Sequence, residues 1–118
     1  MGLANVNPVF HVEDIMEEQK KLQLAIDAID NLCTKILQKE NYQREMQVCV
    51  QSINESCLIL LQENPQEEDI LWILQDMMYG MEQKDEVVLL DVLRFGLRTK
   101  LQQVYNELEN GRQDYINE

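Results

Sequence analysis

Residues 88–101 read VLLDVLRFGLRTKL and form the most apolar stretch of the chain. At the 100° of rotation per residue of an α-helix, the leucines of this stretch fall on one stripe, which predicts an amphipathic helix with that stripe in a core. We expect the helix to run from 86 to about 110, with Asp85 as its N-cap and Gly111 just past its end. The stripe comprises Leu90, Leu93, Leu97, Leu101, Val104 and Leu108.

Two segments of the N-terminal half, 12–40 and 42–63, show the same helical spacing. Their apolar stripes are out of register, so we expect a tight turn near residue 41 rather than one bent helix. The stripe of the first segment comprises Ile15, Leu22, Ala25, Ile26, Ile29, Leu32 and Ile36. The stripe of the second comprises Tyr42, Met46, Cys49, Ile53, Cys57 and Leu60.

A further helix is predicted from residue 65 to about residue 82. Asn64 has the side chain of an N-cap, Pro65 suits the first helical position, and Glu67 can reach back to the cap. The side chains expected to point inward are Ile70, Ile73, Leu74, Met77, Met78 and Met81, with Trp72 on a flank.

Four amphipathic helices with short connections pack most simply as an antiparallel four-helix bundle, so we expect an all-α fold. We assign one helical-bundle domain to residues 12–110, an N-terminal arm to 1–11 and a C-terminal tail to 111–118. The helices differ in length and leave parts of the first and last unmatched. Dimerisation could complete the core there.

The chain carries 22 acidic and 10 basic residues, a formal net charge of -12. Such a charge repels nucleic acid and anionic lipid, so we expect neither as a partner. The longest apolar run, CLILL at 57–61, is far below the ~20 residues of a membrane span. The N-terminus lacks the features of a secretory signal, and three cysteines without C-x-x-C spacing suggest reduced thiols. We therefore expect a cytoplasmic location.

Residues able to carry chemistry are few. The single histidine, His11, shares one turn with Asp14, which provides at most two metal ligands. The Glu-x-x-His pairs of a di-iron bundle, the Gly-rich phosphate loop and the nucleophile elbow are all missing from the sequence. Cys49 and Cys57 lie on an apolar stripe, as small buried side chains do. We expect no enzymatic activity, no cofactor and no metal site.

The opening segment has a second apolar face, formed by Val88, Val92, Phe95 and Thr99. A surface helix needs only one apolar stripe, so this half of the helix either lies centrally in the bundle or meets another chain. We predict an interface at these four residues. Arg94 and Arg98 border the face as a possible anion contact, although the favoured interpretation is that they balance nearby acids such as Asp91.

Residues 81–104, MEQKDEVVLLDVLRFGLRTKLQQV, resemble the closing segment of an uncharacterised family of small acidic helical proteins of Gram-positive bacteria. In that family a short acid-containing turn precedes a Leu-rich helix. Gly96, Leu97 and Arg98 depart from the acidic continuation typical of the family. The resemblance implies a bacterial accessory protein that is associated with motility.

These observations favour a non-enzymatic protein-protein interaction module, an adaptor or chaperone-like accessory protein that binds a protein partner and forms a homo-oligomer through its last helix. One alternative is an acidic mimic that blocks a basic nucleic-acid-binding surface. Another is a thiol or small-molecule sensor that uses Cys49, Cys57 and the methionines near residue 80.

Overall fold

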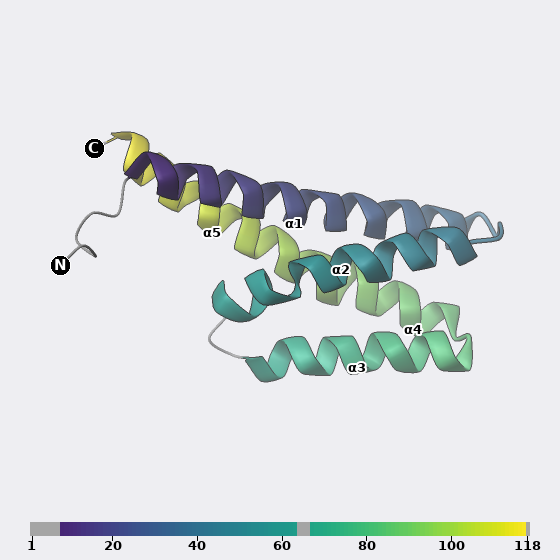
Figure 1. The fold of residues 1–118 in the computed structure, drawn as a ribbon. Helices are drawn as coiled ribbons and strands as arrows, with labels where there is room; N and C mark the ends of the chain where they lie inside the picture. The colour runs from purple at the N-terminus through teal and green to yellow at the C-terminus, as the bar shows by residue number, and fades with distance from the viewer. Residues whose placement is uncertain (1–7, 64–66, 118) are drawn as a thin grey trace.

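The computed structural model describes the backbone of residues 8–63 and 67–117 and the side chains of residues 13–62 and 69–113. The described chain is helical apart from short turns, and the predicted all-α four-helix bundle is confirmed (Figure 1). The helices are α1 (Pro8–Leu37), α2 (Gln43–Glu63), α3 (Glu67–Gln83) and a long last helix, made of α4 (Glu86–Asp91), the π-helical stretch η2 (Val92–Leu97) and α5 (Arg98–Asn117).

The four helices contact one another unequally. α1 packs along both α2 and α5, whereas α3 packs mainly against α4 and η2. Within the described ranges the backbone of α3 does not come close to that of α1, and α3 packs against α2 over only a few residues. Figure 1 shows α1 and α5 side by side, extending together beyond α2 and α3. α3 therefore makes the fewest contacts with the rest of the bundle.

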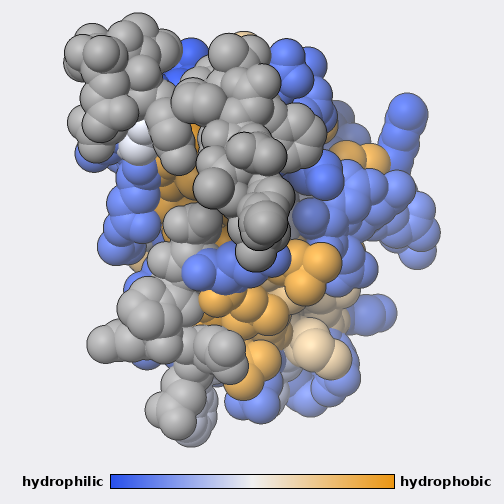
Figure 2. Space-filling model, turned by 60° about the vertical axis from the view of Figure 1, so that its left-hand side comes forward, coloured by the Kyte–Doolittle hydropathy of each residue, from blue (hydrophilic) through white to orange (hydrophobic). Residues whose placement is uncertain are grey.

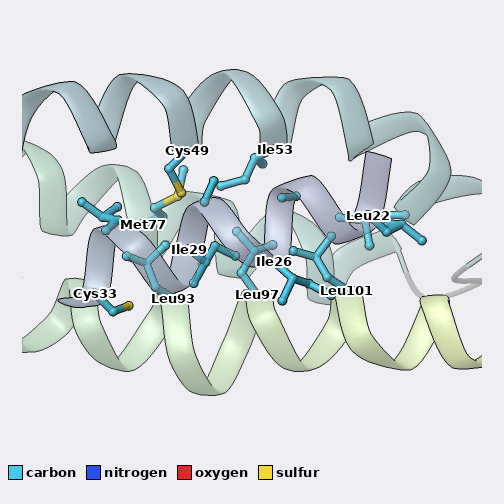
Figure 3. Close-up of a cluster of buried hydrophobic side chains, with 14 of the residues drawn as sticks. Leu22, Ile26, Ile29, Cys33, Cys49, Ile53, Met77, Leu93, Leu97 and Leu101 are labelled. Carbon is cyan, nitrogen blue, oxygen red and sulfur yellow. The ribbon is translucent and has the colours of Figure 1, made fainter. Parts of the chain in front are cut away.

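The core forms where three helices meet. Figure 3 shows side chains of α1, α2 and the last helix pointing into one cluster, with Met77 of α3 at its edge. Burial of each large aliphatic side chain contributes roughly 1.5–3 kcal/mol by transfer from water. The labelled members of the cluster are Leu22, Ile26, Ile29, Cys33, Cys49, Ile53, Met77, Leu93, Leu97 and Leu101.

The π-helical stretch explains the core face of the last helix. Leu89, Leu93, Leu97 and Leu101 are spaced four residues apart and are all at most 1% exposed. Repeated four-residue steps drift around a regular α-helix, because each exceeds its 3.6-residue turn. The backbone N–H of Arg98 donates to the carbonyl of Leu93, five residues back, which widens the turn. The wider turn keeps the four leucines on one side.

The predicted stripe needs one correction as a result. Leu90 was expected in the core, but it is half-buried, and Leu89 is buried in its place. The helical-wheel projection assumed 100° of rotation for every residue. The wide turn at η2 changes this rotation, so side chains before it point in a different direction from the one projected.

The turn predicted near residue 41 is present, and its chemistry matches that of the turn before α4. Lys39 and Lys84 adopt left-handed backbone conformations, with φ of 57° and 53°. In each turn the next residue donates its N–H five residues back, from Glu40 to Lys35 and from Asp85 to Gly80. This bond satisfies a free carbonyl at the helix end. Lysine occupies the left-handed position in both turns, where glycine is usually found. The sequence therefore contains no glycine that would mark either turn.

The helix termini confirm one predicted cap and correct two boundaries. Asp85 accepts a hydrogen bond from the N–H of Val88, as expected of an N-cap. The predicted end at Gly111 is wrong, because α5 continues to Asn117 and Gly111 has no positive φ. Contacts of Glu109 with Arg112 and Gln113 support the helix across this glycine. α1 begins at Pro8 rather than at residue 12.

The predicted cap of the third helix falls outside the described residues, because it involves Asn64 and Pro65. α3 begins at Glu67 in the described part of the chain.

Two helical glycines provide a matched test of packing. A Cβ on Gly80 would lie 3.3 Å from the backbone N and Cα of Leu89, whereas a Cβ on Gly111 would meet nothing within 4 Å. We expect Gly111→Ala to raise the free energy of unfolding by about 0.5–1 kcal/mol through helix propensity. We expect Gly80→Ala to lower it by about 1 kcal/mol, because the clash separates α3 from α4. Urea unfolding measures both, and equal gains would contradict the close α3–α4 packing.

Candidate functional site

The four predicted interface residues do not share one environment. Val88 and Val92 are half-buried, whereas Thr99 is exposed and the side chain of Phe95 is 69% exposed. α3 lies on this side of the helix, since a Cβ on Gly96 would come within 3.5 Å of Ile73. The bundle itself therefore covers part of the second apolar face, and Phe95 is the large apolar side chain of the predicted set that stays outside.

The two arginines beside this face have separate partners. Arg98 donates to both carboxylate oxygens of Asp30 in α1, over 2.8 and 3.2 Å. That hydrogen bond raises the pKa of Arg98 above its ordinary value. The guanidinium of Arg94 lies 5.4 Å from the centre of the Phe95 ring, a cation–π distance. Arg98 is thus paired with a carboxylate on another helix, whereas Arg94 lies against a neighbouring ring. The ion pair of Arg98 links α1 to the last helix.

Among the described residues, α3 carries more exposed large apolar side chains than any other helix, and the sequence interpretation did not select them. Its side chains are each more than half exposed, and two of them precede the other two by seven residues, which places all four on its outer side. We call this set the α3 outer face. It comprises Leu71, Trp72, Met78 and Tyr79.

The exposure of Met78 corrects a prediction. Met78 was expected to point inward, but its side chain is 56% exposed. The stripe was drawn wide enough for a helix enclosed on several sides, whereas α3 packs mainly on α4 and η2. Trp72, expected on a flank, is 64% exposed.

A cavity of about 450 Å³ lies between the beginning of α2 and the end of α3, and its lining includes Tyr42, Met46, Gly80 and Met81. Cys57 follows Met46 by eleven residues, about three helical turns, so it lies on the same side of α2. Figure 2 shows apolar residues gathered on one face of the molecule, with hydrophilic residues around them. Met46, Val50, Cys57 and Leu61 of α2 are half-buried, and Leu71 of α3 is 53% exposed.

The three cysteines fall into two classes. Cys33 and Cys49 are buried, whereas Cys57 on α2 is partly exposed. Burial raises the pKa of the Cys33 thiol, and it raises the pKa of the Cys49 thiol to about 12. A neutral buried thiol is a poor nucleophile, so Cys33 and Cys49 have the properties of core side chains.

Thiol labelling checks this division directly. We expect Cys57 alone to react with a thiol-exchange reagent in the native protein, and Cys33 and Cys49 to react only after denaturant is added. Mass spectrometry of the labelled protein identifies the sites, and a Cys57→Ser variant serves as the unreactive control. Rapid labelling of Cys49 in the native protein would instead support the thiol-sensor alternative for that residue.

Metal and membrane sites were searched over the described residues. Within them no group of three or more His, Cys, Asp and Glu side chains is placed to hold a metal ion. The helices of this part of the chain are also too short or too polar to cross a membrane. The side chain of His11 lies outside the described set.

Comparison with protein-family models, with curated proteins and with solved structures finds no match to this chain.

Proposed function

We propose that this protein is a non-enzymatic helical-bundle module that binds another protein through the α3 outer face. The observation that carries the proposal is the exposure of Trp72 and Tyr79, 64% and 56%, beside Leu71 and Met78 on one helix. Large contiguous apolar patches on soluble proteins mark interaction sites. Tryptophan and tyrosine are also the side chains that most often dominate the energy of protein interfaces.

The acidic-mimic alternative draws support from the charge of α3. The sequence of this helix contains five acidic residues and no basic one. A mimic of nucleic acid would bind mainly through charge, so about 0.5 M salt would abolish its binding. An interface with an apolar centre would keep most of its affinity in that salt.

Partner capture with matched variants tests the proposal. The immobilised protein, a Trp72→Ser/Tyr79→Ser variant and a Leu24→Ser variant are each incubated with extract of the native cell. Leu24 is 60% exposed on α1, away from α3, so its substitution controls for nonspecific hydrophobic binding. The captured protein is then purified and its affinity measured for each form. We expect the double variant to weaken binding by about 30-fold or more, as for an interface hot spot, and the control to change it less than about 3-fold.

A captured protein that binds all three forms equally would contradict the assigned surface. If the wild-type protein recovers no specific partner, the proposed function fails.

Self-association is a separate part of the proposal. Phe95 remains an exposed aromatic residue on the last helix, and a second copy could cover it. Light scattering should then give a dimeric mass for the native protein and a monomeric mass for Phe95→Asp. A monomeric native protein would remove self-association and leave the α3 site in place.

A further inference from the structure

We infer that the cavity between the beginning of α2 and the end of α3 binds a small aromatic carboxylate. None of the four residues of the α3 outer face lines this cavity, so the inference goes beyond the proposed function. The cavity volume of about 450 Å³ lies within the range of about 300–1,000 Å³ that small-molecule sites occupy. A ligand with one aromatic ring and a short acidic side chain fits such a volume.

The position of the cavity follows from the packing of α3. The turn between α1 and α2 and the turn between α3 and α4 lie at the same end of the bundle (Figure 1). α3 packs against α2 over only a few residues, so the two helices leave space between them at this end. Gly80 contributes only backbone to the lining, because a Cβ there would lie 3.3 Å from the backbone of Leu89.

The apolar part of the lining suits an aromatic ring. Met46 of α2 and Met81 of α3 are half-buried in it, and the buried Leu89 and the partly buried Tyr42 complete it. Methionine side chains adapt to the shape of a ligand, and their sulfur atoms make favourable contacts with aromatic rings. Burying the ring among these side chains removes apolar surface from water, which favours binding.

The polar part of the lining offers hydrogen-bond donors. The side-chain oxygen of Asn41 accepts the backbone N–H of Gln43 over 3.0 Å, which leaves the amide nitrogen of Asn41 to donate to a ligand. Lys84 adds an ammonium group, and among the described residues it forms no ion pair. A carboxylate accepts hydrogen bonds from both kinds of donor, and those from an ammonium are charge-assisted.

The acidic residues next to these donors already have partners. Glu40 lines the cavity, and its carboxylate lies 3.5 Å from the ammonium of Lys35. Glu86 accepts a hydrogen bond from the hydroxyl of Tyr42. Neither acid is therefore paired with Lys84, whose charge stays available to a ligand. The net charge of -12 opposes an anion at long range, but physiological salt screens exposed charges beyond about 8 Å, so the direct contact with Lys84 decides.

Methyl NMR of the methionines tests the inference site by site. Met46 and Met81 line the cavity, whereas Met16 and Met78 are 47% and 56% exposed elsewhere and serve as internal controls. The protein is isotope-labelled at the methionine methyl groups and titrated with three probes that share one phenyl ring. The probes are phenylpropionate, its uncharged amide phenylpropionamide, and the cation phenylpropylamine.

We expect phenylpropionate to shift the signals of Met46 and Met81 saturably, with a dissociation constant of about 1 mM or less for a ligand of this size. The signals of Met16 and Met78 should stay unchanged. The amide should bind about 3-fold more weakly or worse, because it carries no charge for Lys84, and the amine about 10-fold more weakly, because like charges repel.

A Lys84→Gln variant isolates the contribution of the ammonium, and Lys39→Gln is its matched control. Lys39 adopts the same left-handed backbone conformation in the other turn, with φ of 57° against 53°, and it does not line the cavity. We expect Lys84→Gln to lower the affinity for phenylpropionate to that for the amide, and Lys39→Gln to change it less than about 2-fold. Far-UV circular dichroism confirms that both variants retain their helical content.

Each other outcome overturns the inference. If no probe shifts Met46 and Met81, the cavity binds no ligand of this class. Shifts at Met78 alone would place the probe on the α3 outer face. Equal affinities for the carboxylate and the amide, or equal effects of the two lysine variants, would show binding without recognition of the carboxylate. Partner capture through Trp72 and Tyr79 decides the proposed function separately from all of these results.

Discussion

Replacing Leu97 with alanine is expected to lower the free energy of unfolding by about 2–5 kcal/mol, the range measured for buried leucines in well-packed cores. Leu97 has no exposed surface and lies in the cluster shared by α1, α2 and the last helix (Figure 3). Its neighbours in the helix are held by the wide turn of η2, so they cannot easily rotate to fill the space. Urea unfolding followed by circular dichroism measures the loss.

Phe95→Ala is the matched control, two residues away on the same helix. Phenylalanine is at least as apolar as leucine, and hydrophobicity alone would assign Phe95 the larger loss. Its ring is 69% exposed, and its contact with Arg94 is a surface cation–π pair. We expect a loss of about 0.5–1 kcal/mol. A larger loss for Phe95 than for Leu97 would mean that the core face of the last helix has been assigned to the wrong side.

Local patterns in the sequence were sufficient to predict the four helices and some of their ends. The spacing of Leu22, Ile29 and Ile36 reflects a period that the helix carries by itself. Asp85 acts as a cap because its side chain reaches an amide three residues away. Such features depend on neighbours in the chain, and the sequence contains them directly.

Features that depend on neighbours in space could not be predicted in the same way. The inward position of Leu89 instead of Leu90 follows from the π-helical turn of η2. No residue type in the sequence indicates such a turn. The exposure of Met78 follows from the one-sided packing of α3. A wheel projection gives the direction of a side chain and leaves open whether another helix lies in that direction.

The candidate site shows the same division. Phe95 was singled out because a second apolar face is visible on a wheel, and it is exposed in the structure. The α3 outer face was missed, because Trp72 was placed on a flank and Met78 in the core. One signal was present in the sequence: α3 has apolar residues around most of its circumference, which a helix packed on one side does not need.

Stability should fall steeply at alkaline pH because of Cys49. Burial raises the pKa of this thiol from its ordinary value of 9.0 to about 12, so the folded protein keeps it neutral where the unfolded chain would ionise it. A group whose folded pKa lies above its unfolded pKa contributes its full stability below the unfolded value and loses it as pH rises toward the folded value. The window is therefore pH 9 to about 12, and Cys49 alone should remove about 2–3 kcal/mol by about pH 11.

A Cys49→Ala variant isolates this contribution from the other groups that titrate in the same range. Alanine leaves a small cavity and lowers stability by a similar amount at every pH, but it has no proton to lose. Urea unfolding of both proteins under reducing conditions, at about pH 8 and about pH 11, gives two pH dependences, and the variant should have the shallower one by about 2–3 kcal/mol. Parallel pH dependences would mean that the Cys49 thiol ionises in the folded protein, which requires water to reach it. The core between α1 and α2 would then open to water at this point.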